Sequence, residues 1–149
     1  MAVATRTLKD TVVNAPKAGG KVTVLVTFDD EVSKNENILD ASALDGHANG
    51  AKLDIIRLWW GINNPRVSTL TGDGTDNDDQ NFVAIEFKGA SSDTLAINLA
   101  GTGHYDGTAG PITNNATNTT ATSGDLEASF NAVSGFIIIE LRKDENFTS

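Results

Sequence analysis

At 149 residues, of which 39% are hydrophobic, the chain suits one domain with a core, and it has no run of about 18 apolar residues that could span a membrane. The absence of cysteine excludes disulfides, thiol catalysis and thiolate metal sites. A net charge of −9, with no basic cluster visible in the sequence, argues against nucleic acid as a direct partner, because phosphates would be repelled.

The N-terminal twenty residues form a predicted arm. Charges within Met1–Asp10 interrupt the apolar stretch that a signal peptide needs, so we expect synthesis in a cytoplasm and a start near Met1. A short alternating stretch, Arg6–Val13, precedes residues 14–20, which have the composition of a flexible hinge. Such a strand can pair with its own sheet or with a neighbouring subunit. Its candidate contact residues are Arg6, Leu8 and Val12.

The rest of the chain is predicted to be β-strand, because apolar residues recur with a period of two. The clearest example is 22–28, where Val22, Val24, Val26 and Phe28 alternate with more polar neighbours. Glycine- and asparagine-rich turns separate the runs. The other expected strands are 38–39, 52–60, 67–70, 82–88, 94–99, 125–130 and 136–141, the last of them rich in isoleucine and expected to be buried on both faces.

Two adjacent tryptophans, Trp59 and Trp60, end the long strand 52–60. Neighbouring strand residues point to opposite faces, so only one of the two can enter a given core. The other is either covered by a loop of the same domain or exposed as part of an interface or a sugar-stacking platform. Both residues are therefore candidate contact residues.

The acidic loop Asp73–Gln80 has oxygen-bearing residues at alternate positions, as calcium loops do. Its sixth position is Asp78 where a glycine belongs, and its twelfth is Ala84 where a bidentate glutamate belongs. We therefore expect a solvated connection that binds no metal, and no cofactor is predicted for the chain.

Catalytic patterns are weak. His47 and His104 lie in turn-rich segments, and neither accompanies a nucleophile motif. Glu86 and Glu127 are expected on the polar faces of alternating strands, where a glycosidase could place two carboxyl groups, but half-solvated sheets carry glutamates routinely. The sequence thus predicts a protein that is not an enzyme.

A polar, low-complexity segment, 112–124, is rich in asparagine and threonine. It is expected to be a long surface loop, too polar to order itself, that becomes fixed when a neighbour binds. Its candidate contact residues are Asn114, Asn115 and Thr117.

Many short strands separated by turns predict an all-β chain, folded as a single jelly-roll-like β-sandwich with the flexible N-terminal arm and the long Asn/Thr-rich loop. The expected divisions are an arm (1–20), a sandwich domain (21–143) and a C-terminal tail (144–149).

Five stretches of the sequence carry a family resemblance: the strand end Ile55–Trp60, the pattern Leu99–Asp106, and Gly110–Ala116 followed by Thr122–Leu126 and the closing Phe136–Lys143. Together they resemble small virion structural proteins of tailed bacteriophages, cyanophages among them. The resemblance covers roughly residues 53–143 and consists of glycines and strand ends. It implies a structural role in the particle and carries over no functional residue.

The resemblance favours a capsid decoration or cement protein that binds and stabilises the outer surface of the head as a homo-oligomer. Its implied partners are the major capsid protein and copies of itself, and its implied location is the virion. A neck or tail component is the closest alternative. A carbohydrate-binding β-sandwich that uses Trp59 or Trp60 is the alternative from another class, and an enzyme ranks last.

Overall fold

The computed structural model describes residues 3–11, 20–63 and 82–147, and most of these lie in β-strands. The only helix within these ranges is one 3-10 turn, η1 (Ala41–Ala43). The all-β prediction is confirmed, and the strands form one open antiparallel sheet. The strands are β1 (Ala4–Asp10), β2 (Lys21–Leu39), β3 (His47–Asn63), β4 (Phe82–Phe87), β5 (Thr94–Ala100), β6 (Thr102–Tyr105) and β7 (Leu126–Phe147).

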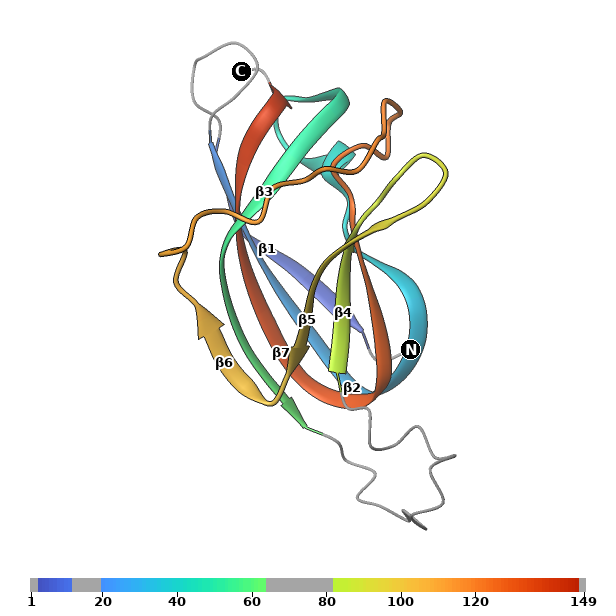
Figure 1. Cartoon of the computed structure of the whole chain (residues 1–149), viewed down its shortest axis with the longest axis vertical. Helices are drawn as coiled ribbons and strands as arrows, with labels where there is room; N and C mark the ends of the chain where they lie inside the picture. The colour runs from blue at the N-terminus through green and yellow to red at the C-terminus, as the bar shows by residue number, and fades with distance from the viewer. Residues whose placement is uncertain (1–2, 12–19, 64–81, 148–149) are drawn as a thin grey trace.

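Strand β7 organises the sheet. Its first part pairs with β4 and with the second half of β2, and its later part pairs with β3 and with the first half of β2. Strands β2, β3 and β7 run side by side along the molecule (Figure 1). Register shifts follow Phe28 in β2, and Asp30 and Ala132 have positive φ angles of 47° and 53°. Such irregularities bend long strands, so β2 and β7 each take part in both halves of the sheet.

The core lies on one side of this bent sheet, where the apolar positions of the alternating strands converge. The rings of Phe28 and Phe130 meet there with centroids 4.9 Å apart. Burying each aliphatic side chain contributes roughly 1.5–3 kcal/mol before entropy is counted. Fully buried members include Val22, Val26, Leu53, Ile55, Leu58, Val83, Ile85, Leu126, Ile137, Ile139 and Leu141.

The expected double-sided burial of the isoleucine-rich strand is wrong. Ile137 and Ile139 are fully buried, but Phe136 is 40% exposed and Ile138 is only half-buried. The alternate residues face outward, on the side of the sheet opposite the core. The expected strands 125–130 and 136–141 are also parts of one strand, β7, and the strand 22–28 continues to Leu39.

The N-terminal strand β1 lies on its own sheet, paired with the first half of β2. A buried ion pair fixes its end: the Lys143 ammonium is 2.5 Å from an Asp10 carboxylate oxygen and also donates to the Asp45 carbonyl. The Lys143 side chain is fully buried and lies over the Phe147 ring. Of the two predicted arrangements, the arm adopts the one in which it folds back on its own domain. Val12 lies outside the described residues.

The Asn/Thr-rich loop orders itself, which corrects the expectation that it is too polar to do so. Its asparagine side chains fold it, since Asn114 Oδ1 accepts from the Ala116 amide and Asn118 Oδ1 accepts from the Thr120 amide. The Ser123 hydroxyl donates to a backbone carbonyl of β3. Alternate residues, Asn114, Ala116 and Asn118, are buried against the domain.

Candidate functional site: the outer face of the sheet

The candidate site is the outer face of five strands, on the side opposite the core. Cross-strand register aligns one complete row of residues across β1, β2, β7, β3 and β6. Since side chains in one row of a sheet point to the same side, this row forms a continuous strip. Its members, in order, are Arg6, Leu25, Ile138, Trp59 and His104.

Neighbouring rows extend the strip in both directions. We call the residues of these rows, with those of the first row, the outer face. On one side the row is Ala4, Thr27, Phe136, Gly61 and Thr102. On the other side come two rows: first Lys9, Thr23, Glu140 and Arg57, and then Lys21, Arg142 and Asp54.

The centre of the outer face is apolar. Trp59 is 38% exposed and Phe136 is 40% exposed, with Leu25 and Ile138 half-buried beside them. Gly61 makes room for the Phe136 ring, because a Cβ at that position would lie 2.9 Å from a ring carbon. Exposed aromatic groups that are contiguous with aliphatic ones are typical of interaction sites.

One side of the outer face is basic, and we call its charged residues the rim. Five of the chain's 11 basic residues lie in these rows with two acidic ones, so the rows carry +3, whereas the remaining six basic and 18 acidic residues carry −12. Arg57 pairs with Glu140 at 2.7 Å, and Arg142 pairs with the buried Asp54 at 2.9 Å. The other cations, Arg6, Lys9 and Lys21, have no ion pair with any described residue.

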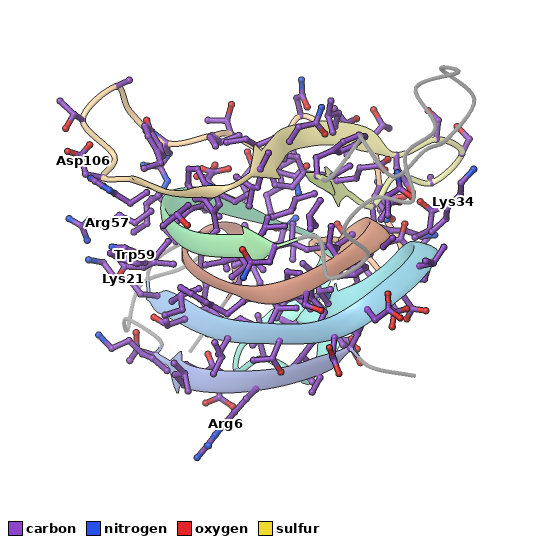
Figure 2. The ribbon with its side chains drawn as sticks, turned by 90° about the horizontal axis from the view of Figure 1, so that it is seen from below. Arg6, Lys21, Lys34, Arg57, Trp59 and Asp106 are labelled. Atoms are coloured by element: carbon purple, nitrogen blue, oxygen red, sulfur yellow. The ribbon has the colours of Figure 1, made fainter. Side chains whose placement is uncertain are left out.

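Figure 2 shows Lys21, Arg57 and Trp59 close together at one side of the molecule, Arg6 projecting from β1, and Lys34 at the opposite side. Asp106, just beyond the end of β6, lies near Arg57 at the margin. Asp106 accepts from both the amide and the hydroxyl of Thr108, and these hydrogen bonds hold the pKa of its carboxyl below the usual range.

The predicted contact residues separate into two groups. Arg6 and Trp59 lie in the same row of the outer face, and Leu8, 51% exposed, lies at the β-bulge of β1. Trp60 points to the core side, packs over Gly103 and donates its indole N–H to the Ala100 carbonyl at 3.0 Å. The two tryptophans therefore take opposite faces, as the alternation predicts.

The three contact residues predicted in the Asn/Thr-rich loop are not part of the outer face. Asn114 is buried, and its backbone amide donates to the Asp54 carboxylate at 2.9 Å. Asn115 and Thr117 are exposed, and the Thr117 carbonyl accepts from the Ala90 amide. Asn114 thus helps to hold the loop against β3.

The histidines also take structural positions. His47 lies 2.9 Å from the Ser123 carbonyl and meets the Phe147 ring edge-on, whereas His104 is exposed on β6. The acidic loop Asp73–Gln80 and the expected strand 67–70 lie outside the described residues. Within the described ranges no group of three His, Asp or Glu residues is placed to hold a metal ion, and no helix has the length and apolar character to cross a membrane.

A second polar cluster lies at the end of the β4–β5 hairpin. Glu127, which faces Glu86 across β7 and β4, is buried rather than solvated, shares a hydrogen bond with Asp93 and lies 3.5 Å from the Lys88 ammonium. Burial, together with the nearby Asp93 carboxylate, raises the pKa of Glu127 to about 7. The same hydrogen bond lowers the pKa of Asp93. The cluster can hold one proton between two carboxyl groups, and it ties the hairpin to β7.

Sequence reasoning missed most of the outer face. It places Leu25 and Ile138 in strands without identifying them as contact residues, and it judges the cations by their spacing along the chain. The signal that could have found Leu25 is the outward parity of Thr23, Leu25 and Thr27 in an alternating strand. The gathering of cations from β1, β2, β3 and β7 depends on register, which the sequence does not display.

Comparison with known proteins adds no assignment: no family model, no curated protein and no solved structure matches the chain.

Proposed function

We propose that the chain is a structural protein of a tailed-phage virion, a decoration or cement protein that binds the outside of the head. The observation that carries the proposal is the outer face, where Trp59 and Phe136 are exposed at the centre of five strands with a basic rim. Interfaces of this kind are enriched in aromatic residues and arginine. The bacteriophage part of the proposal rests on the sequence resemblance.

The architecture supports this proposal. A sheet that exposes one broad face offers area for protein contact, and the net charge of −9 suits an outer surface better than one that faces packaged DNA. We further propose that the bends in β2 and β7 close the sheet into a jelly-roll-like sandwich in the assembled protein.

The first experiment is a mass-spectrometric inventory of purified particles with copy numbers. A decoration protein occurs in proportion to the capsomers of the shell, whereas a neck or tail component occurs in the number that one ring requires. A low, ring-like copy number would transfer the assignment to the neck or tail. Absence of the chain from intact particles would refute the virion proposal.

The second experiment adds purified protein back to particles that lack it. Trp59→Ala is expected to weaken binding at least about tenfold, because truncation of a central tryptophan typically costs more than about 1.4 kcal/mol of binding energy. Leu95→Ala is the matched control, since Leu95 is 55% exposed on β5, away from the outer face. Equal binding of the two variants would show that the outer face does not bind the shell.

A carbohydrate-binding module is the second candidate, and the exposure of Trp59 beside the polar groups of Arg57 and His104 favours it. Sugars stack on such flat aromatic surfaces. Binding on a glycan array that is lost in Trp59→Ala, together with absence of the chain from particles, would favour this candidate over the virion proposal.

A further inference from the structure

We infer that the occupant of the outer face is the acidic side of a second copy of this chain, bound head to tail. The inference rests on the proposed function in one respect, namely that the outer face is an assembly surface. It assigns this face to the contact between copies, so that the part of particle binding that depends on Trp59 acts through the oligomer, and it adds the symmetry of the contact.

The centre of the outer face requires a protein partner with an apolar contact area. Trp59 and Phe136 lie in adjacent rows, and Leu25 and Ile138 fill the space beside them. Water is excluded from an aromatic centre of this size only when a partner covers all of it. A charged rim then excludes water from the edge.

The charge of the rim determines which part of a second copy fits. Arg6, Lys9 and Lys21 are unpaired within the described residues, and the rows of the outer face carry +3. A symmetric contact would place two outer faces together and bring like charges into opposition, which disfavours association. The remainder of the chain, with −12, offers the opposite charge.

The counterpart is the second half of β2, which exposes acidic side chains and also Val32, 58% exposed, as an apolar contact for the aromatic centre. Residues 29–40 contain five carboxylates and a single basic residue, Lys34. Asp29 and Asp40 are exposed and Glu36 is half-exposed. Strand β1 pairs with β2 only as far as Thr27, so no described strand covers the other edge of this half. This segment is therefore accessible to the cations of a neighbouring copy.

The two surfaces lie toward opposite ends of β2, since the outer face uses Lys21 to Thr27, whereas Glu36 and Asp40 lie at the other end, beyond the part that pairs with β1. Figure 2 shows Lys34, within the acidic half, far from Lys21 and Arg57. A contact between different surfaces is heterologous, and it closes into a ring or extends into a chain according to the rotation between neighbours. A ring of copies would let a decoration protein surround a symmetry axis of a shell.

The test uses charge reversal on the full chain. The face variant is Arg6→Glu with Lys21→Glu, the edge variant is Glu36→Lys with Asp40→Lys, and Thr119→Glu is the control at an exposed position outside both surfaces. Sedimentation equilibrium at low salt is expected to show association of the unaltered chain, weakened at least about tenfold in either double variant. Thr119→Glu is expected to associate as tightly as the unaltered chain, because it changes a charge outside both surfaces.

Mixing provides the decisive arm of the experiment. Each double variant keeps one intact surface, and the two altered surfaces carry swapped, complementary charges, so a mixture of the face and edge variants is expected to associate where neither variant does alone. A symmetric contact through the outer face predicts instead that the edge variant alone associates as tightly as the unaltered chain, because its outer face is unchanged. Circular dichroism of every variant confirms that the fold is retained.

The inference is overturned if the unaltered chain remains monomeric, if either double variant associates as well as the control, or if the mixture shows no rescue. Binding of an acidic particle protein, a glycan or duplex DNA to the outer face of a monomeric chain would also overturn it. The proposed function is tested separately: loss of particle binding in Trp59→Ala without self-association would retain the virion proposal and reject the head-to-tail contact.

Discussion

Replacing Asp10 with asparagine should destabilise the protein, because it leaves a buried ammonium without its counter-charge. The Lys143 side chain has no exposed surface, and the Asp10 carboxylate at 2.5 Å is its only ionic partner within the described residues. The Asp45 carbonyl at 2.8 Å and the Phe147 ring, 5.3 Å from the ammonium, remain as neutral partners. The neutral amide of the Asp10→Asn variant would leave the positive charge uncompensated.

The expected loss is about 3 kcal/mol of unfolding free energy. Breaking a buried ion pair by removing one partner typically costs about 3–5 kcal/mol, which is roughly a fifth or more of the stability of a small domain. The lower end applies because the Asp10 side chain is 19% exposed and because the lysine keeps its two neutral partners. The control is Glu140→Gln, which breaks the more exposed Arg57–Glu140 pair and should cost less than about 1 kcal/mol.

Urea unfolding followed by tryptophan fluorescence measures both variants. Lys143→Met in the Asp10→Asn background should restore most of the lost stability, because replacing both members of a buried pair by neutral groups is often close to neutral. A cost of Asp10→Asn no larger than that of Glu140→Gln would refute the reasoning. So would a double variant that is no more stable than Asp10→Asn alone.

Three further predictions concern the pH dependence, the loop and the bend. With a folded-state pKa of about 7 against an ordinary 4.5, Glu127 stabilises the protein fully below pH 4.5 and loses this contribution as pH rises to 7. The free energy of unfolding measured in urea should therefore fall by about 1–2 kcal/mol over that range, a figure discounted for solvent screening. In the Glu127→Gln variant this fall should be absent. Ser123→Ala deletes the buried hydroxyl that donates to the Ala51 carbonyl, and in the same assay it should lower the free energy of unfolding by about 1–2 kcal/mol. Thr119→Ala, at an exposed position of the same loop, is the control and should have no measurable effect. Gly135→Ala should cost more than about 3 kcal/mol or prevent folding, which circular dichroism and urea unfolding would detect, because the new Cβ would lie 1.9 Å from a backbone carbonyl oxygen of β3 at a φ of 148°.

Much of the fold could be predicted because alternation is a local signal. The strand 82–88 corresponds to β4 (Phe82–Phe87), and the strand 94–99 corresponds to β5 (Thr94–Ala100). Alternation could not predict that a strand continues across a bend. Ser134 and Gly135 have the composition of a turn, yet they lie inside β7, where Gly135 allows the backbone of Gly61 to approach closely.

The candidate site was less predictable than the fold, for a physical reason. The opposite orientation of Trp59 and Trp60 follows from the two-residue period of a strand, and the structure confirms it. The alignment of Arg6 with Trp59 requires three successive registers, from β1 to β2, β7 and β3. A shift of one residue in any of them would send one of these side chains to the core side.

The predicted grip of the N-terminal arm on a neighbouring subunit can be tested with a stabilised deletion. The bulge at Leu8 and the charges of Arg6 and Lys9 discourage a further strand from pairing with the free edge of β1, so main-chain pairing between subunits requires β1 to leave its own β2. Deleting residues 2–18 also removes Asp10 and leaves Lys143 unpaired, so loss of binding could reflect instability alone. The deletion should therefore be combined with Lys143→Met, which removes the unpaired charge. If this truncated variant folds and still forms the same oligomer and binds particles as tightly as the intact chain, the arm is not a grip. If it folds but loses the oligomer, the arm exchanges between subunits.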